Sequence, residues 1–264
     1  MFGKAILLAM SGSALMFGCA AQQDSADETQ EIIDNLVQAG FPASDIMVAD
    51  GLVYTGRDAQ VSLQASREML QADPAAGSQE QYRTTNLLST AMTTICVNGS
   101  AFTSFSAKFS QGLDLAIGNY NGLGLRFTLR RTTGSTTGCS ATITGRVSTG
   151  TGGSSGFPSG GRPFNTINIG SGLNSGTFSV DVLEHVITHE LGHTLGMRHS
   201  DFFNRSISCG GAASNEGDGG VGAILIAGTP SGATVGGSIM NSCFRSTETG
   251  EFTSSDRVAW TTVY

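Results

Sequence analysis

The sequence is poor in charged and aromatic residues for a chain of 264 residues. Charged residues make up 13% and aromatic residues 7%, whereas glycine is abundant at 37 residues. Lys and Arg form no cluster and the formal net charge is −7, so we expect no nucleic-acid partner. Low charge with abundant glycine indicates the loop-rich surface of an exported protein rather than a cytosolic one.

The sequence also has no convincing membrane span at its N-terminus. The apolar run over residues 5–17 is too short to cross a bilayer. It follows a basic Lys4, so residues 1–19 are typical of a signal peptide. The end of this stretch, Met-Phe-Gly-Cys at residues 16–19, is similar to the lipobox of bacterial lipoproteins, in which the cysteine is lipidated. We therefore predict a lipid anchor at Cys19 in the cell envelope; ordinary cleavage a few residues later, giving a secreted protein, is the alternative.

Cysteine is scarce, at five residues. If Cys19 carries a lipid, four cysteines remain, an even number in an oxidising compartment. Two disulfides can then form in three pairings, of which the most local joins Cys96 to Cys139 and Cys209 to Cys243. Buried free thiols are the alternative.

Charge is unevenly distributed along the chain. Residues 1–80 carry eleven acidic and three basic residues, a net charge of −8, whereas residues 81–264 carry ten and eleven, a net charge of +1. After the signal peptide we therefore predict an acidic segment over residues 20–80 and a main domain over residues 81–264. Two full enzyme domains would not fit this length.

Hydrophobic periodicity predicts helices and strands in both parts. Helices are expected at residues 28–38, 59–71, 105–120, 180–195 and 253–263, and strands at 46–54, 93–97, 123–129, 140–147 and 166–169. The Gly- and Ser-rich residues 149–161 show no periodicity and predict a mobile loop. Strands and one helix followed by a central helix and loops indicate an α+β domain. Ser254 or Ser255 is the expected N-cap of the last helix.

The four histidines of the chain all lie between residues 185 and 199. On a helix, His189 and His193 would be about 40° apart around the axis and about 6 Å apart along it, so both rings can reach one ion. In a continuing helix, His199 would lie about 240° round and about 9 Å further on, facing away. The helix must therefore end first, and Gly196 can end it because glycine adopts the left-handed conformation.

Three neutral imidazoles leave one coordination position of zinc open, which is typical of a catalytic site. We predict Zn²⁺ held by His189, His193 and His199, with a water in the open position. Glu190 is then the general base that accepts the proton of this water. A structural zinc site is the alternative, but it gives Glu190 no purpose.

The run over residues 189–201, His-Glu-Leu-Gly-His-Thr-Leu-Gly-Met-Arg-His-Ser-Asp, resembles the metzincin pattern His-Glu-x-x-His-x-x-Gly-x-x-His, which is followed downstream by a methionine turn. Met240, in Ser-Ile-Met-Asn, is the candidate for that turn. The run is similar to the bacterial dual-action HEIGH metallopeptidases, as is Gln-Tyr-Arg-Thr-Thr-Asn at residues 81–86, although Leu191 stands where the family name implies Ile. The resemblance covers roughly residues 40–264.

This resemblance implies a metzincin-like zincin domain with a twisted mixed sheet, two main helices, a methionine turn and a C-terminal helix. It implies that residues 81–264 are the catalytic domain of a zinc endopeptidase acting on proteins or peptides. The signal peptide adds export, and we expect a monomer. The helical and strand spacing in residues 20–80 favours a small folded pro-segment over a disordered linker. A surface zinc-binding or adhesive lipoprotein without hydrolytic activity, and a zinc hydrolase of a non-peptide bond, are the competing interpretations.

Astacin-like enzymes, a related group, suggest two further points. They carry a tyrosine two residues after the turn methionine, where this sequence has Ser242, so no such tyrosine is expected. Their propeptides place an aspartate on the zinc within Phe-x-Gly-Asp, and Tyr-Thr-Gly-Arg-Asp at residues 54–58 is similar with one extra residue. We hypothesise that Asp58 displaces the catalytic water; a turn aspartate is the alternative.

Two polar residues near the motif are expected to have structural roles. His185 lies one turn before His189, but a fourth histidine ligand would close the open position, so we expect it to pack or to form hydrogen bonds. Asp201 is expected to form a salt bridge or hydrogen bond rather than to act in catalysis. In metzincins, substrate typically pairs with an edge strand above the central helix. The resemblance therefore implies that the strand at 166–169 is that edge strand, with the preceding loop as a lid.

Overall fold

The computed structural model describes residues 18–70, 81–217, 223–230 and 232–264. The predicted signal peptide lies outside these ranges except for Gly18 and Cys19, which begin helix α1 (Gly18–Gln38). The predicted boundary after residue 80 also falls at the edge of an undescribed stretch. None of the described helices combines the length and apolarity that a membrane crossing requires.

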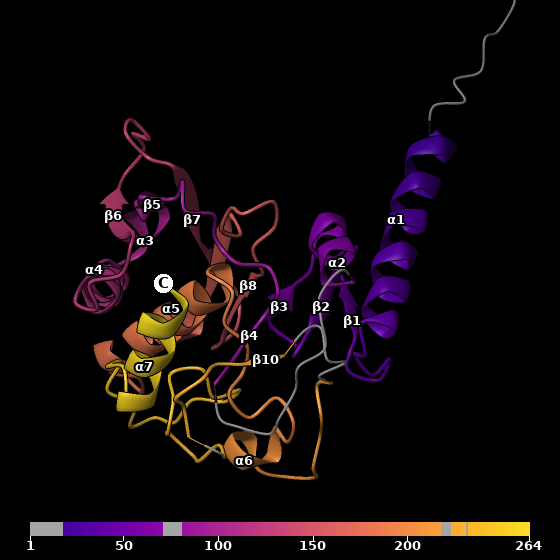
Figure 1. Ribbon diagram of the computed structural model, residues 1–264. Coiled ribbons are helices and arrows are strands. Elements are labelled where there is room, and N and C mark those ends of the chain that lie inside the picture. The colour runs from indigo at the N-terminus through magenta and orange to yellow at the C-terminus, as the bar shows by residue number, and fades with distance from the viewer. Residues whose placement is uncertain (1–17, 71–80, 218–222, 231) are drawn as a thin grey trace, which may run out of the picture.

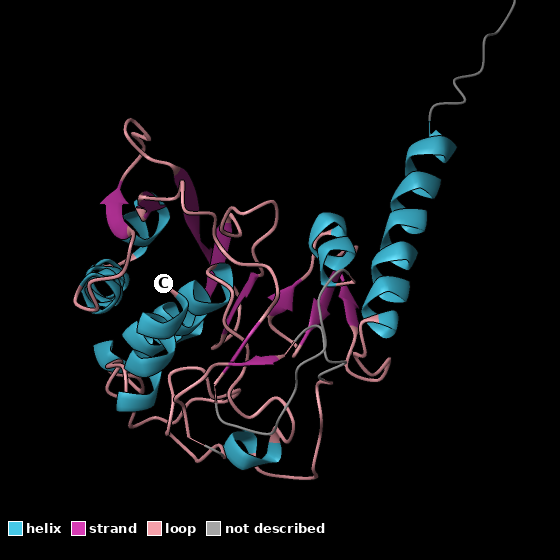
Figure 2. Ribbon diagram, viewed as in Figure 1, coloured by secondary structure: helices cyan, strands magenta, loops and turns pink. Residues whose placement is uncertain are grey.

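The main domain is built on five neighbouring strands of one mixed sheet (Figure 2). Four of these strands run parallel to their neighbours, and the fifth, β8, runs antiparallel to β9. In spatial order the strands are β8 (Gly153–Gly156), β9 (Thr166–Gly170), β7 (Ala141–Ser148), β5 (Thr94–Asn98) and β6 (Thr128–Thr132). A separate antiparallel pair consists of β4 (Tyr82–Arg83) and β10 (Ile224–Leu225).

Helices α4 (Ala107–Asn121), α5 (Val180–Thr194) and α7 (Ser254–Val263) gather at one side of this sheet (Figure 1). Aromatic rings join the first and last of them, since Tyr120 lies 5.0 Å from Trp260 between ring centroids. The N-cap of α7 is Thr253, which forms a capping box with Asp256 and replaces the serines that the sequence suggested. The smaller helices are α3 (Ser100–Phe105), the 3₁₀ turn η1 (Ser171–Asn174) and α6 (Ser206–Cys209).

The acidic segment extends the same sheet at the β8 end. Its strands are β1 (Met47–Ala49), β2 (Leu52–Thr55) and β3 (Ala59–Gln60), and β3 pairs in parallel with β8. Helices α1 and α2 (Leu63–Met69) lie beside these strands at the right of Figure 1. These elements have an apolar core of their own, which also includes Phe157 of the main domain.

The expectation of an α+β architecture with a mixed sheet and two main helices is confirmed, but two predictions around residues 149–170 are wrong. The Gly-rich loop predicted at 149–161 contains β8, and β9 is an interior strand rather than an edge. Periodicity could not reveal β8 because its residues are Gly-Ser-Ser-Gly. A helix predicted at 59–71 is also shorter, since β3 precedes α2.

Both disulfides form in the most local pairing. Cys96 of β5 is bonded to Cys139, just before β7, and Cys209 of α6 is bonded to Cys243. The second bond ties α6 to the segment that follows Met240. Because that segment lies beside the histidines, this disulfide helps to position the functional site.

Candidate metal centre and active site

Helix α5 presents His189, Glu190 and His193 from a buried position. Its N-cap is Ser179, whose hydroxyl accepts a hydrogen bond from the backbone NH of Val182 at 3.2 Å. Every residue of α5 from Val182 to Thr194 is buried. A helix enclosed on all sides can hold its side chains in fixed positions, which a multidentate site requires.

The helix ends at Gly196, as the sequence predicted. Gly196 has a φ of +106°, and the backbone NH groups of Gly196 and Met197 donate to the carbonyls of His193 and Gly192. This hydrogen-bond pair is the Schellman ending of a helix, which reverses the chain. The reversed chain is then held by a hydrogen bond from the NH of Arg198 to the carbonyl of Tyr82 at 2.9 Å, and His199 follows.

Each of the three histidines forms a hydrogen bond through its Nδ1 atom to an oxygen. His189 faces the carbonyl of Ile239 at 2.8 Å, and His193 faces the carbonyl of Met197 at 2.8 Å. His199 faces Oε1 of Glu216 at 2.7 Å. Because carbonyl and carboxylate oxygens only accept hydrogen bonds, these contacts place a proton on each Nδ1, so that Nε2 is the nitrogen that can bind a metal ion.

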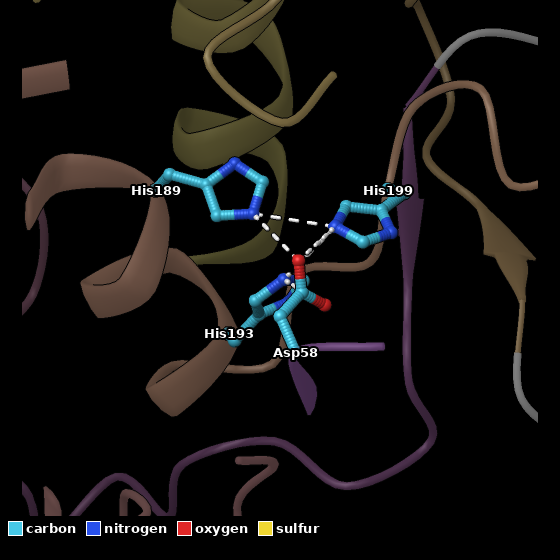
Figure 3. Close-up of side chains that lie close together, drawn as sticks. All are labelled: Asp58, His189, His193 and His199. Carbon is cyan, nitrogen blue, oxygen red and sulfur yellow. Dashed lines mark hydrogen bonds and ion pairs between the residues drawn. The ribbon is translucent and has the colours of Figure 1, made fainter. Parts of the chain in front are cut away.

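The three Nε2 atoms and the carboxylate of Asp58 converge on one point (Figure 3). Nε2 of His199 lies 3.3 Å from Nε2 of His193 and 3.3 Å from Nε2 of His189. Lone pairs at this separation repel one another unless a proton or a metal ion lies between them. Tetrahedral zinc with Zn–N bonds of about 2.0–2.1 Å requires about 3.3–3.4 Å between its nitrogen ligands, so these residues fit a metal ion.

Asp58 occupies the fourth side of this cluster. Its Oδ2 atom lies 3.1 Å from Nε2 of His199 and 3.8 Å from Nε2 of His189, and its Oδ1 atom lies 3.7 Å from Nε2 of His193. The chain turns sharply just before Asp58. Gly56 and Arg57 both have positive φ in this turn, at +60° and +74°, and the turn directs Asp58 toward the histidines. Asp58 therefore lies beside all three histidines, while its displacement of a catalytic water stays a prediction.

Glu190 faces the same site from α5. Its Oε2 atom accepts a hydrogen bond from the hydroxyl of Ser155 in β8 at 2.7 Å. Burial and the negative charge of Asp58 raise the pKa of Glu190 well above its usual value, and the Ser155 hydrogen bond opposes this shift. A cation bound at the histidines would also favour the charged carboxylate.

The methionine turn packs against α5 next to the metal centre. Met240 is buried, and a Cβ atom added at Gly192 would lie 2.5 Å from its sulfur. The turn is fixed from the C-terminal helix, because Asp256 accepts hydrogen bonds from the hydroxyl of Ser238 and from the NH of Ile239. This turn therefore also positions the carbonyl that orients His189.

A comparison with protein-family models matches residues 53–264 to the dual-action HEIGH metallo-peptidase family. The chain belongs to this family. It is a metallopeptidase, and its substrates are proteins or peptides. The match begins inside the segment predicted as a pro-segment and includes Asp58.

Other comparisons add little to this family assignment. One solved structure of myroilysin has 16% sequence identity and a TM-score of 0.41, and the match covers 71% of this chain and 98% of that one. A second myroilysin structure has 11% identity and a TM-score of 0.33, covering 70% and 86%. Among curated proteins no match is found.

Sequence reasoning missed Glu216, which orients His199 in this metallopeptidase. Glu216 is buried, and its Oε1 atom also accepts a hydrogen bond from Arg205 at 3.0 Å. Arg205 in turn donates to the carbonyl of Gly56 in the turn before Asp58. Glu216 lies in a loop of small polar residues, which carries no periodic signal for a functional carboxylate.

The other predicted polar residues lie outside the metal cluster. Asp201 has the structural role that was expected, because it accepts hydrogen bonds from the hydroxyls of Ser208 at 2.6 Å and Ser242 at 2.7 Å. Ser242 stands where astacin-like enzymes have a tyrosine, and its hydroxyl is thus engaged with Asp201. His185 is buried and is not one of the four converging residues.

Proposed function

We propose that this metallopeptidase is an exported, zinc-dependent endopeptidase with His189, His193 and His199 as metal ligands and Glu190 as general base. The observation that carries the proposal is the orientation of the three rings, whose Nδ1 atoms are all occupied and whose Nε2 atoms converge. Three imidazoles with a carboxylate nearby are typical zinc donors. Zinc held by these residues would supply Lewis acidity, which would acidify a water and polarise a peptide carbonyl.

Glu190 supplies the proton transfers in this mechanism. Ser155 bonds to its Oε2 atom, and among the described residues no hydrogen bond reaches its Oε1 atom. Oε1 therefore accepts a proton from water as the water oxygen attacks the carbonyl carbon. The same proton then passes to the nitrogen of the scissile bond, the C–N bond breaks, and the amine leaves.

Substrate would pair with the outer edge of β8. This strand lies beside Glu190, because the hydroxyl of Ser155 in β8 donates a hydrogen bond to Glu190. In the full chain β3 occupies that edge, and Asp58 occupies the fourth side of the histidine cluster. We infer that the segment before residue 81 keeps the enzyme latent in two ways, by covering the edge and by supplying a carboxylate where the catalytic water would lie.

Export and lipid attachment at Cys19 are supported by the N-terminal sequence and by the two disulfides, since disulfides persist in oxidising compartments. We propose the cell envelope as the location, with full secretion as the alternative. Mass spectrometry of the membrane fraction distinguishes them, because a lipidated N-terminal peptide beginning at Cys19 is expected and an unmodified one would contradict the anchor.

The decisive test of the proposed function is Glu190→Gln in the full chain with Asp58→Ala. We expect casein cleavage to fall by about 10²–10⁴-fold, the range for loss of general acid–base catalysis. Elemental analysis is expected to find one zinc per chain in both proteins, because Glu190 is not a ligand. His189→Ala is the matched control and loses both zinc and activity.

Three outcomes would contradict parts of the proposal. Cleavage that survives Glu190→Gln would show that another residue is the base. Stoichiometric zinc without any cleavage of casein or peptides would favour a non-hydrolytic zinc-binding lipoprotein. Hydrolysis of esters or small amides without peptide cleavage would indicate that the enzyme hydrolyses a bond other than the peptide bond.

A further inference from the structure

A cavity of about 210 Å³ opens beside the metal centre. It lies between helix α5, the chain just before and at the start of β8, and the segment after the methionine turn. Its lining includes Glu190 and Gly153 on one side and Asn241 and Phe244 on the other. Since a water takes about 30 Å³ of the liquid, the cavity has room for one amino-acid side chain, next to the bond that Glu190 acts on.

His185 lines this cavity with two unpaired ring nitrogens. The residue is 2% exposed, and neither Nδ1 nor Nε2 has a hydrogen-bond partner among the described residues. The nearest carboxylate oxygen, Oε2 of Glu248, lies 4.0 Å from Nδ1, beyond hydrogen-bonding distance. The other three histidines all have an oxygen partner at Nδ1, so His185 differs from them.

The ring of His185 is neutral at pH 7. Burial, together with the neighbouring His189, lowers its pKa to about 4. A neutral imidazole offers one N–H donor and one nitrogen acceptor. A hydroxyl group is the natural complement, because it can accept from the donor or donate to the acceptor.

The cavity has both polar and apolar walls, and Arg57, Asp58, Asn241 and Ser242 are among its polar residues. Val186 lies beside His185 on α5, and the ring of Phe244 lies 6.4 Å from that of His185 between centroids. Buried polar groups in proteins are nearly always hydrogen-bonded. An unpaired neutral ring with Val186 and Phe244 beside it therefore fits a ligand that places an apolar body against these two side chains and a hydroxyl against the ring.

We propose that His185 is a specificity-determining residue that selects a tyrosine side chain next to the scissile bond, in preference to phenylalanine. This inference rests on the proposed function. Phenylalanine fills the same volume but leaves the ring of His185 unpaired. A charged side chain would gain no ion pair from the neutral ring of His185.

Binding of p-cresol, the side chain of tyrosine, tests the pocket without any catalysis. The chain has four histidines, so its ¹⁵N-histidine NMR spectrum is simple, and His185→Leu assigns the fourth ring. We expect p-cresol to shift the His185 signal in the full chain and to bind about 5–10-fold more tightly than toluene, the effect of one neutral hydrogen bond. Equal binding of the two, or an unmoved His185 signal, would overturn the inference.

Cleavage of a peptide library by the Asp58→Ala chain tests the same residue in the reaction. We expect peptides with tyrosine at one position flanking the cleaved bond to be cleaved about 5–10-fold faster than peptides with phenylalanine there. In His185→Leu we expect the ratio of these two rates to fall to about one. His185→Asn keeps a hydrogen-bonding group and should retain part of the preference. Leu115→Ala is the control, because Leu115 is exposed on α4 and does not line the cavity, so the tyrosine preference should stay in place.

The two experiments separate the inference from the proposed function. Library cleavage with an unchanged ratio in His185→Leu would refute the role of His185 and leave the peptidase function intact. An absence of all cleavage would refute the proposed function, while p-cresol binding would still decide whether His185 forms a hydroxyl site. Thermal unfolding of each variant shows that it is folded.

Discussion

At the scale of single residues, the site depends on atoms that do not face the metal. The Nδ1 contacts of the three histidines determine which nitrogen carries the lone pair, and two of their acceptors are backbone carbonyls. Glu216 provides the third acceptor and also contacts Arg205, which reaches the turn before Asp58. Glu216 thus connects a histidine ligand to the segment that holds Asp58.

Replacement of Asp58 by alanine is expected to raise basal peptidase activity of the full chain at least about tenfold, because the fourth side of the metal centre becomes available to water. Cleavage of a fluorogenic peptide measures this. Asp50→Ala is the matched control, since Asp50 is an exposed aspartate in the turn between β1 and β2. Equal basal activity of wild type and Asp58→Ala would rule out latency through this residue.

At the scale of elements, strand β8 is short and has small side chains, and it passes close to Glu190, the proposed general base. A Cβ atom added at Gly153 would lie 2.3 Å from Oε1 and 2.6 Å from Cγ of Glu190. At Gly156 it would lie 2.5 Å from the carbonyl of Gln60 in β3. The glycines therefore permit a close approach that any larger residue would prevent.

Gly153→Ala is expected to lower the rate of peptide cleavage by the Asp58→Ala chain by about 10²-fold. The added methyl group would displace the carboxylate of Glu190, and a displacement of about 1 Å in an active site can reduce the rate by about this factor. Gly152→Ala is the matched control, because no atom lies within 4 Å of a Cβ added there. Initial rates with casein measure both. If both alanine variants cleave equally well, close contact between β8 and Glu190 is not required for catalysis.

The sequence predicted the parts of the site that lie within one short stretch, and it missed those contributed from elsewhere. The spacing of the histidines required a helix end at Gly196, and the structure has it there. Ser155 and Glu216 were not foreseen, because each reaches the motif from a loop-like stretch of glycine and small polar residues. Periodicity reports burial on one face, and β8 has too few side chains to show it.

At the scale of the whole molecule, a buried carboxylate between the main helices makes stability depend on pH. Glu184 of α5 is 3% exposed and accepts a hydrogen bond from Asn119 of α4 at 2.7 Å. Burial raises its pKa from 4.5 to about 7. The folded protein therefore binds this proton more tightly than the unfolded chain, so the stabilising contribution is complete below pH 4.5 and is lost as the pH rises through about 7.

Glu184→Gln keeps the acceptor for Asn119 and removes this titration. We expect the melting temperature of the variant, relative to wild type, to rise between pH 5 and pH 8, as measured by calorimetry at several pH values. Glu28→Gln is the control, because Glu28 is exposed on α1. A constant difference between Glu184→Gln and wild type across this range would contradict the role assigned to Glu184.

Asp58 lies directly before β3, which pairs with β8 in the same sheet and on the same polypeptide as the proposed catalytic residues. A group tethered in this way has an effective concentration of the order of millimolar or more, whatever the concentration of the protein. If Asp58 confers latency as proposed, inhibition does not weaken when the protein is diluted after export. Only a break in the chain, followed by separation of the two parts, would make the inhibitory carboxylate subject to dilution.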